Sequence, residues 1–156
     1  MKTRRDPEYK EFEQGPIRPP SEASSLLLRL TRNCPWNHCT FCRIYKGKPF
    51  SLRPVAHIIK DIDLIKVYTD RMADILKPGA PVDHDVIAAL YASFKEKDRI
   101  AFNVAMNWYA AGMQSIFLQD ANSLIMKPDD LVRILDHLRA CFPDVERITS
   151  YARSHT

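Results

Sequence analysis

Three cysteines, Cys34, Cys39 and Cys42, lie within nine residues and have the spacing C-x4-C-x2-C. Three thiols cannot all pair with one another as disulfides, because one is left over. They can instead converge on one metal centre. On a cubane [4Fe–4S] cluster, three protein thiolates leave one iron without a protein ligand, and such an iron can bind and activate a small molecule. The spacing therefore predicts a metal centre with an open position.

Three other interpretations of these cysteines remain open at this point. A zinc site has four ligands, and His38, inside the loop, is the nearby candidate for a fourth. A plant-type [2Fe–2S] ferredoxin combines this spacing with a distant fourth cysteine, which could only be Cys141. Cys141 has helical spacing from Ile134 and Leu138, however, as a small core residue would, and the pI near 8.9 suits an acidic electron carrier poorly. The third alternative is a set of free structural thiols.

Composition is that of one globular domain. The chain has 156 residues, 46% hydrophobic and 27% charged, which is enough to bury a sizeable core. It contains no run of 18 apolar residues, so we expect no membrane partner, and its charged N-terminus lacks the apolar stretch of a secretory signal. We therefore expect a cytoplasmic protein, in which clustered cysteines more often bind metal than form disulfides. The net charge of +4 comes from scattered residues, which argues against a nucleic-acid partner.

The elements that would position the cysteines follow the order strand, helices, strand, helix, strand. The apolar run 25–31 predicts a strand buried on both faces. The cysteine loop follows at its carboxyl end, where α/β folds bind ligands. Further strands are predicted over 114–119 and 145–151, and helices over 51–76, 83–95, 99–111 and 127–142. This order predicts an α/β fold with about three parallel strands and intervening helices.

The two ends of the chain carry different expectations. Residues 1–24 are charged and contain several prolines, so we expect an extended leader with little order of its own. Residues 25–156 would form the folded unit. Three parallel strands leave an exposed sheet edge, and we therefore expect this unit to be the N-terminal half of a larger barrel, truncated in this chain.

Four segments, TRNCPWNHCTFC, FSLRP, FLQDAN and ITSYAR, resemble a bacterial branch of the radical S-adenosylmethionine (radical SAM) superfamily. The aromatic Phe41 before the third cysteine and the strand–helix order add to the resemblance, which covers about residues 25–156. The commonest spacing in the superfamily is C-x3-C-x2-C, so this chain has one extra residue between Cys34 and Cys39. The resemblance implies a partial (β/α)6 barrel.

The resemblance also implies an activity. In such enzymes the open iron chelates S-adenosylmethionine, and the reduced cluster cleaves it to methionine and a 5′-deoxyadenosyl radical, which abstracts hydrogen from a substrate. Cys34, Cys39 and Cys42 would ligate the [4Fe–4S] cluster, and a reductant such as flavodoxin or ferredoxin would supply the electron. The substrate and the reaction type are unknown. The alternative is a non-catalytic iron–sulfur or zinc-binding module.

Four further residues are implied as cofactor-binding. Phe41 would lie against the adenine region. Asp120, at the end of the second strand, would accept hydrogen bonds from the amino group of the cofactor, or would otherwise be a turn or cap residue. Ser150 and Tyr151, at the carboxyl end of the third strand, would face the ribose or the substrate, unless Tyr151 is a packing residue.

Overall fold

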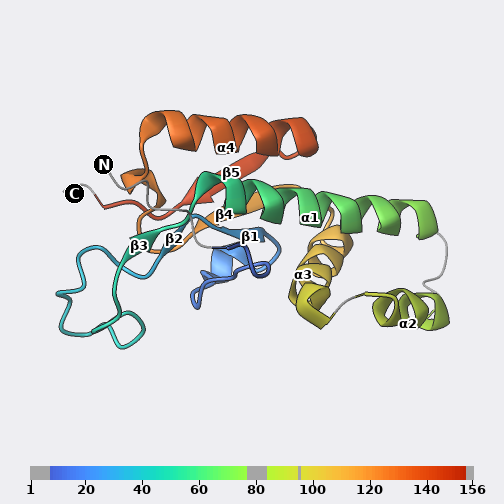
Figure 1. Ribbon diagram of the computed structural model, residues 1–156, viewed down its shortest axis with the longest axis horizontal. Helices are drawn as coiled ribbons and strands as arrows, with labels where there is room; N and C mark the ends of the chain where they lie inside the picture. The colour runs from blue at the N-terminus through green and yellow to red at the C-terminus, as the bar shows by residue number, and fades with distance from the viewer. Residues whose placement is uncertain (1–7, 77–83, 95, 154–156) are drawn as a thin grey trace.

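The fold is built on a parallel sheet of three strands, in a computed structural model that describes residues 8–76, 84–94 and 96–153. The strands are β1 (Leu26–Arg29), β4 (Ser115–Gln119) and β5 (Arg147–Ser150), in the order β1-β4-β5 with β4 in the centre (Figure 1). Their register aligns Leu28 with Leu118 and Leu118 with Ser150. The predicted α/β fold with three parallel strands is confirmed. Within the described residues the sheet remains open and does not close into a barrel.

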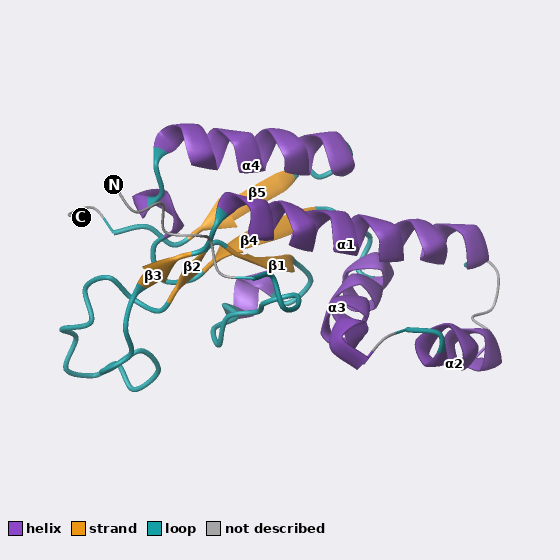
Figure 2. Ribbon diagram, viewed as in Figure 1, coloured by secondary structure: helices purple, strands orange, loops and turns teal. Residues whose placement is uncertain are grey.

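Four helices accompany the sheet, as the sequence predicted. They are α1 (Val55–Ile75), α2 (His84–Ala92), α3 (Arg99–Ala110) and α4 (Pro128–Cys141), and the short 3-10 turns are η1 (Pro20–Glu22), η2 (Glu96–Asp98) and η3 (Ser123–Ile125). Helices α1 and α4 run side by side along one face of the sheet (Figure 2). The predicted ends of α2 at residues 83 and 95 lie outside the described residues. Every helix in the described part of the chain is too short or too polar to span a membrane.

The main core lies between the helices and one face of the sheet. Alternate strand residues point to this face because successive side chains of a strand alternate. Leu26, Leu28, Ile116 and Leu118 pack there against helix residues that include Ile58, Ile62, Ile65, Phe102, Trp108, Ile134 and Leu138, all at most 4% exposed. The predicted apolar helix faces therefore form the core.

A second, two-stranded sheet was not predicted. Strands β2 (Thr31–Arg32) and β3 (Ser51–Leu52) pair antiparallel, with Thr31 opposite Leu52. The predicted helix start at Ser51 is wrong, and α1 begins at Val55, because the ring of Pro54 disfavours the helical conformation at Arg53 and Pro54 itself is extended. The short pairing brings residues 32 and 51 together and so closes the base of the cysteine loop.

The N-terminal segment covers the sheet face opposite the helices. Gly15 N–H donates to Gln119 Oε1 at 2.8 Å, and Gln119 Nε2 donates to the carbonyl of Ile17. Glu22 is buried and accepts hydrogen bonds from Thr149 Oγ1 at 2.9 Å and from Arg147 at 3.1 Å. The expectation of little order is therefore wrong for residues 8–24, because polar side chains of β4 and β5 hold this segment in place. Residues 1–7 lie outside the described residues.

Candidate metal and cofactor site

The cysteine loop leaves the sheet at the carboxyl end of β1 and returns at β3 (Figure 1). Cys34, Cys39 and Cys42 are half-buried, and their thiols are free of disulfides. Within the described residues, their sulfur atoms are not part of any group of three ligand atoms that lie within 4.8 Å of one another. The structure thus does not gather the predicted ligands around a single point. A single ion needs such gathering, whereas thiolates on a cubane cluster bind different irons and lie farther apart.

The surroundings of the Cys42 thiol favour its thiolate form. The backbone N–H of Tyr45, and then that of Ile44, hold the pKa of the Cys42 thiol below its usual value. Lys46 acts in the same direction through its charge, and desolvation opposes it. Because the thiolate is the form that binds metals, this end of the loop favours the ligand state.

A single buried carboxylate, that of Asp120, holds both ends of the cysteine loop. Its side chain is 0% exposed. Oδ2 accepts hydrogen bonds from Arg29 Nη2 at 2.7 Å and Nε at 2.9 Å, and from the backbone N–H of Asn33 at 3.1 Å. Oδ1 accepts from the Tyr45 hydroxyl at 2.8 Å. Asn33 directly precedes Cys34, and Tyr45 closely follows the third cysteine, so Asp120 ties the entry of the loop to its exit.

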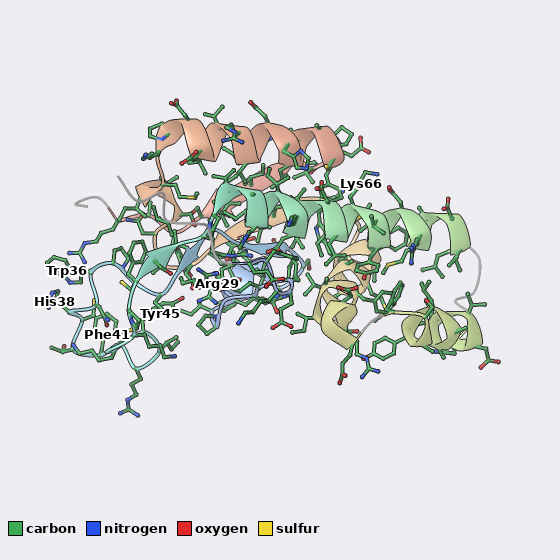
Figure 3. The ribbon with its side chains drawn as sticks, in the orientation of Figure 1. Arg29, Trp36, His38, Phe41, Tyr45 and Lys66 are labelled. Atoms are coloured by element: carbon green, nitrogen blue, oxygen red, sulfur yellow. The ribbon has the colours of Figure 1, made fainter. Side chains whose placement is uncertain are left out.

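The hydroxyl of Tyr45 keeps its proton and donates a hydrogen bond to Asp120. Burial raises the pKa of Tyr45 well above its usual value, and the hydrogen bond to Asp120 raises it further. Tyr45 is 3% exposed. Figure 3 shows Arg29 and Tyr45 toward the base of the loop, with Trp36, His38 and Phe41 farther out. The base of the loop is therefore firmly bonded, while its outer part reaches solvent.

An ion-pair network extends from Asp120 into the rest of the protein. Glu13 pairs with Arg29 at 2.8 Å, Arg32 at 2.7 Å and Arg53 at 3.1 Å, and Arg53 pairs with Asp61 at 2.7 Å. Burial raises the pKa of Glu13, but the three arginines outweigh it and lower the pKa below its usual range. At Asp61 burial prevails over Arg53 and raises the pKa. The N-terminal segment thereby connects the loop base to α1.

The other predicted cofactor residues occupy separate places. The Phe41 side chain is 84% exposed, so it does not pack under the loop as a core aromatic. Ser150 Oγ donates to the carbonyl of Tyr151 at 2.9 Å. Tyr151 is 46% exposed and packs edge-on against Phe117, with ring centroids 5.2 Å apart.

The outer part of the loop also reaches the end of β5. The guanidinium carbon of Arg153 lies 3.7 Å from the centroid of the Trp36 ring, a cation–π contact. Trp36 in turn packs edge-on against His38, with centroids 5.0 Å apart. Together with Asn33 after β1 and Asp120 after β4, this contact places the cysteine loop across the carboxyl ends of all three strands.

A hollow of about 340 Å³ opens beside the base of the loop. It is lined by residues of the N-terminal segment together with Arg32, Arg53 and His57. None of the three loop cysteines lines it. This hollow therefore adjoins the ion-pair network and not the thiols.

Several residues of this site were missed in the sequence, namely Glu13, Arg29, Tyr45, Arg53 and Asp61. One feature of the sequence could have revealed part of this network. Arg29 interrupts the apolar run of β1, and a charge in a buried strand requires a partner. The partner, Asp120, was singled out for a different role.

Gly15 offers a test of the contact between the N-terminal segment and the site. A Cβ atom at Gly15 would lie 2.2 Å from Asp120 Oδ1 and 3.2 Å from Gln119 Cδ. Since Asp120 is fixed by its partners, we expect Gly15→Ala to lower the free energy of unfolding by about 1–3 kcal/mol, as overpacking does. Urea denaturation of Gly15→Ala and of the unaltered chain measures this difference. An unchanged stability for Gly15→Ala would show that this segment is not pressed against Asp120.

Comparison with protein-family models, with curated proteins and with solved structures finds no match for this chain in any of the three. The assignment of the site therefore rests on its own chemistry.

Proposed function

We propose that this chain is the cluster-binding part of a radical SAM protein, in which Cys34, Cys39 and Cys42 hold a [4Fe–4S] cluster. The observation that carries the proposal is the position of the loop: three free thiols in a short segment across the carboxyl ends of three parallel strands. Ligands of α/β sheets bind at this edge. The barrel to which the sheet would belong, and a cytoplasmic location in which thiols stay reduced, are parts of the same proposal.

The residues of the chain would prepare and hold the cluster. The three cysteines supply thiolates, and Cys42 is already biased to that form. Arg43, Lys46 and Lys48 are exposed on the loop, and their positive charge suits an anionic cluster. When bound, the cluster would supply the electron that breaks a carbon–sulfur bond of S-adenosylmethionine, after reduction by a donor such as flavodoxin or ferredoxin.

Asp120 takes a different role from the one its position in the sequence indicated. Its two oxygens already accept hydrogen bonds from Arg29, Tyr45 and Asn33. A fully engaged carboxylate is a poor acceptor for the amino group of a cofactor, because an existing partner would have to leave. We therefore assign Asp120 as a positioning residue that shapes the loop.

A second candidate function is a cluster-binding module without turnover. The face of the sheet opposite the helices would be the interior of a closed barrel. Here residues 13–22 cover that face through Gln119, Thr149 and Arg147. A covered interior favours a protein that binds a cluster without binding a substrate. Measuring the release of 5′-deoxyadenosine would distinguish this function from the catalytic one.

Anaerobic reconstitution tests the proposal. We expect four irons and four sulfides per chain, visible absorption that bleaches in air, and an electron paramagnetic resonance spectrum of the reduced cluster that changes when S-adenosylmethionine is added. The change follows because one iron lacks a protein ligand. Stoichiometric zinc without sulfide would instead establish a zinc-binding module. An intact cluster whose spectrum does not change when S-adenosylmethionine is added would contradict the proposal that one iron lacks a protein ligand.

A further inference from the structure

A cluster of possible metal ligands lies between α1 and α4. Asp63 on α1 faces His137 and Cys141, which are one turn apart on α4 and so share a face of that helix. His137 Nε2 is 2.6 Å from Asp63 Oδ1 and 3.6 Å from Cys141 Sγ. Within the described residues, this is the one group of three such atoms that lie within 4.8 Å of one another.

The location separates this cluster from the cysteine loop. Lys66, one turn beyond Asp63 on α1, is labelled in Figure 3 near the end of α4, while Trp36, His38 and Phe41 mark the loop at the opposite end of the molecule. The cluster therefore has no part in the site described above. Metal binding by these three residues would be independent of the proposed function.

Asp63 and Cys141 approach the same ring nitrogen of His137, and this argues against a catalytic relay through that histidine. In a cysteine–histidine–aspartate relay the carboxylate bonds one ring nitrogen and the thiol bonds the other, so that the ring passes a proton between them. Here the carboxylate of Asp63 and the thiol of Cys141 both approach Nε2 of His137. Three different ligand atoms that converge on one point form the arrangement that a metal ion requires.

We propose that Asp63, His137 and Cys141 bind one divalent transition-metal ion of the zinc type, which bridges α1 and α4. Thiolate sulfur, imidazole nitrogen and carboxylate oxygen are the three ligand types that zinc takes in proteins. Three protein ligands leave a fourth tetrahedral position for water or another small ligand. The ion would link helix α1 to helix α4.

The distances fit this ion with one small adjustment. Zinc–nitrogen and zinc–sulfur bonds of ordinary length at a tetrahedral angle place the two atoms about 3.5 Å apart, against 3.6 Å between His137 and Cys141. The corresponding nitrogen–oxygen separation is about 3.3 Å, so Asp63 must move away from His137 from its present 2.6 Å. The Asp63 side chain is 53% exposed, and its rotation meets little resistance.

The open position of the ion has room beside it. A hollow of about 390 Å³ adjoins Cys141 and is also lined by Lys66, Thr69 and Asp70. The Lys66 ammonium pairs with Asp70 at 2.5 Å, and Asp144 adds a second carboxylate to the wall. A water molecule can therefore reach the ion from this side.

Cobalt(II) is the probe, because it replaces zinc and absorbs light when a thiolate binds it. The full chain with Cys34, Cys39 and Cys42 all replaced by serine keeps Cys141 as its only thiol. We expect a thiolate-to-cobalt band that saturates at one ion per chain and that zinc displaces. Adding Cys141→Ser should remove the band, and adding His137→Gln should weaken cobalt binding at least tenfold. Asp136→Asn removes a negative charge at an exposed residue next to His137 and should leave binding unchanged. Absence of the band, its survival in Cys141→Ser, or unchanged cobalt affinity in His137→Gln would overturn the proposal.

A second measurement uses the unaltered chain and so does not depend on how the serine variant folds. Alkylation of Cys141, followed by mass spectrometry of its peptide, should slow at least several-fold when zinc is added. The same addition should have little effect in His137→Gln. Equal alkylation with and without zinc in the unaltered chain, or equal protection in His137→Gln, would reject the site.

Discussion

Replacing Asp120 with alanine should lower the free energy of unfolding by about 3–5 kcal/mol, the usual cost of removing one partner from a buried ion pair. The Asp120 side chain is 0% exposed and that of Arg29 is 12% exposed, so the guanidinium would lose its nearest counter-charge away from bulk water. The hydroxyl of Tyr45 would also lose its acceptor. Urea denaturation measures the effect. Asp74→Ala, an exposed change on α1, should stay within about 0.5 kcal/mol of the unaltered chain.

The Asp120 variants also separate two roles for this residue. As the positioning residue of the loop, Asp120 should be needed for both stability and cluster occupancy, because it bonds Asn33 and Tyr45 on either side of the cysteines. Asp120→Asn keeps an acceptor for Tyr45 but loses the charge opposite Arg29, so its loss of stability should be intermediate. If Asp120 only bound the amino group of the cofactor, stability would be unchanged and the response to S-adenosylmethionine alone would weaken.

The parallel sheet could be predicted because its strands are continuous apolar runs. Such runs indicate burial on both faces, and both faces are indeed covered. Leu28 and Leu118 pack beneath the helices, while Leu27 and Phe117, at 2% and 3% exposure, are buried on the other face. What the pattern could not indicate is the cover of the second face. The N-terminal segment binds there largely through polar groups such as Gly15 N–H and Glu22. Contacts of this kind produce no periodic pattern of hydrophobic residues in the sequence.

The candidate site was predictable in its position but not in its internal bonding. The C-x4-C-x2-C loop lies beyond the carboxyl end of β1, as the sequence predicted, with only the two-residue strand β2 between them. The two-residue strands β2 and β3 are too short for any periodicity to reveal, so the closure of the loop base was missed. The partners of Asp120 come from positions 29, 33 and 45, far from it in the chain. Only the fold brings them together.

Serine at Cys34, Cys39 or Cys42 should each abolish the cluster, whereas Cys141→Ser should leave its iron and sulfide content unchanged. Each of the three loop cysteines is proposed to bind a separate iron, and the hydroxyl of serine is a poor substitute for a thiolate. Cys141 ends α4, beside Asp63 and His137 and away from the loop, and so is not placed to ligate a centre there. Iron and sulfide analysis after anaerobic reconstitution measures the loss.

The four cysteine variants, together with His38→Ala, also distinguish the remaining interpretations of the cysteines. A ferredoxin-type [2Fe–2S] centre needs four cysteines, so Cys141→Ser would then lose iron as fully as the loop variants do. A zinc site in the loop would instead need a fourth ligand such as His38, and His38→Ala would remove the metal without any sulfide being involved. Retention of iron and sulfide in any one of the three loop variants would contradict a three-thiolate cluster. Loss confined to those three, with His38→Ala and Cys141→Ser intact, is the pattern that an iron with an open position requires.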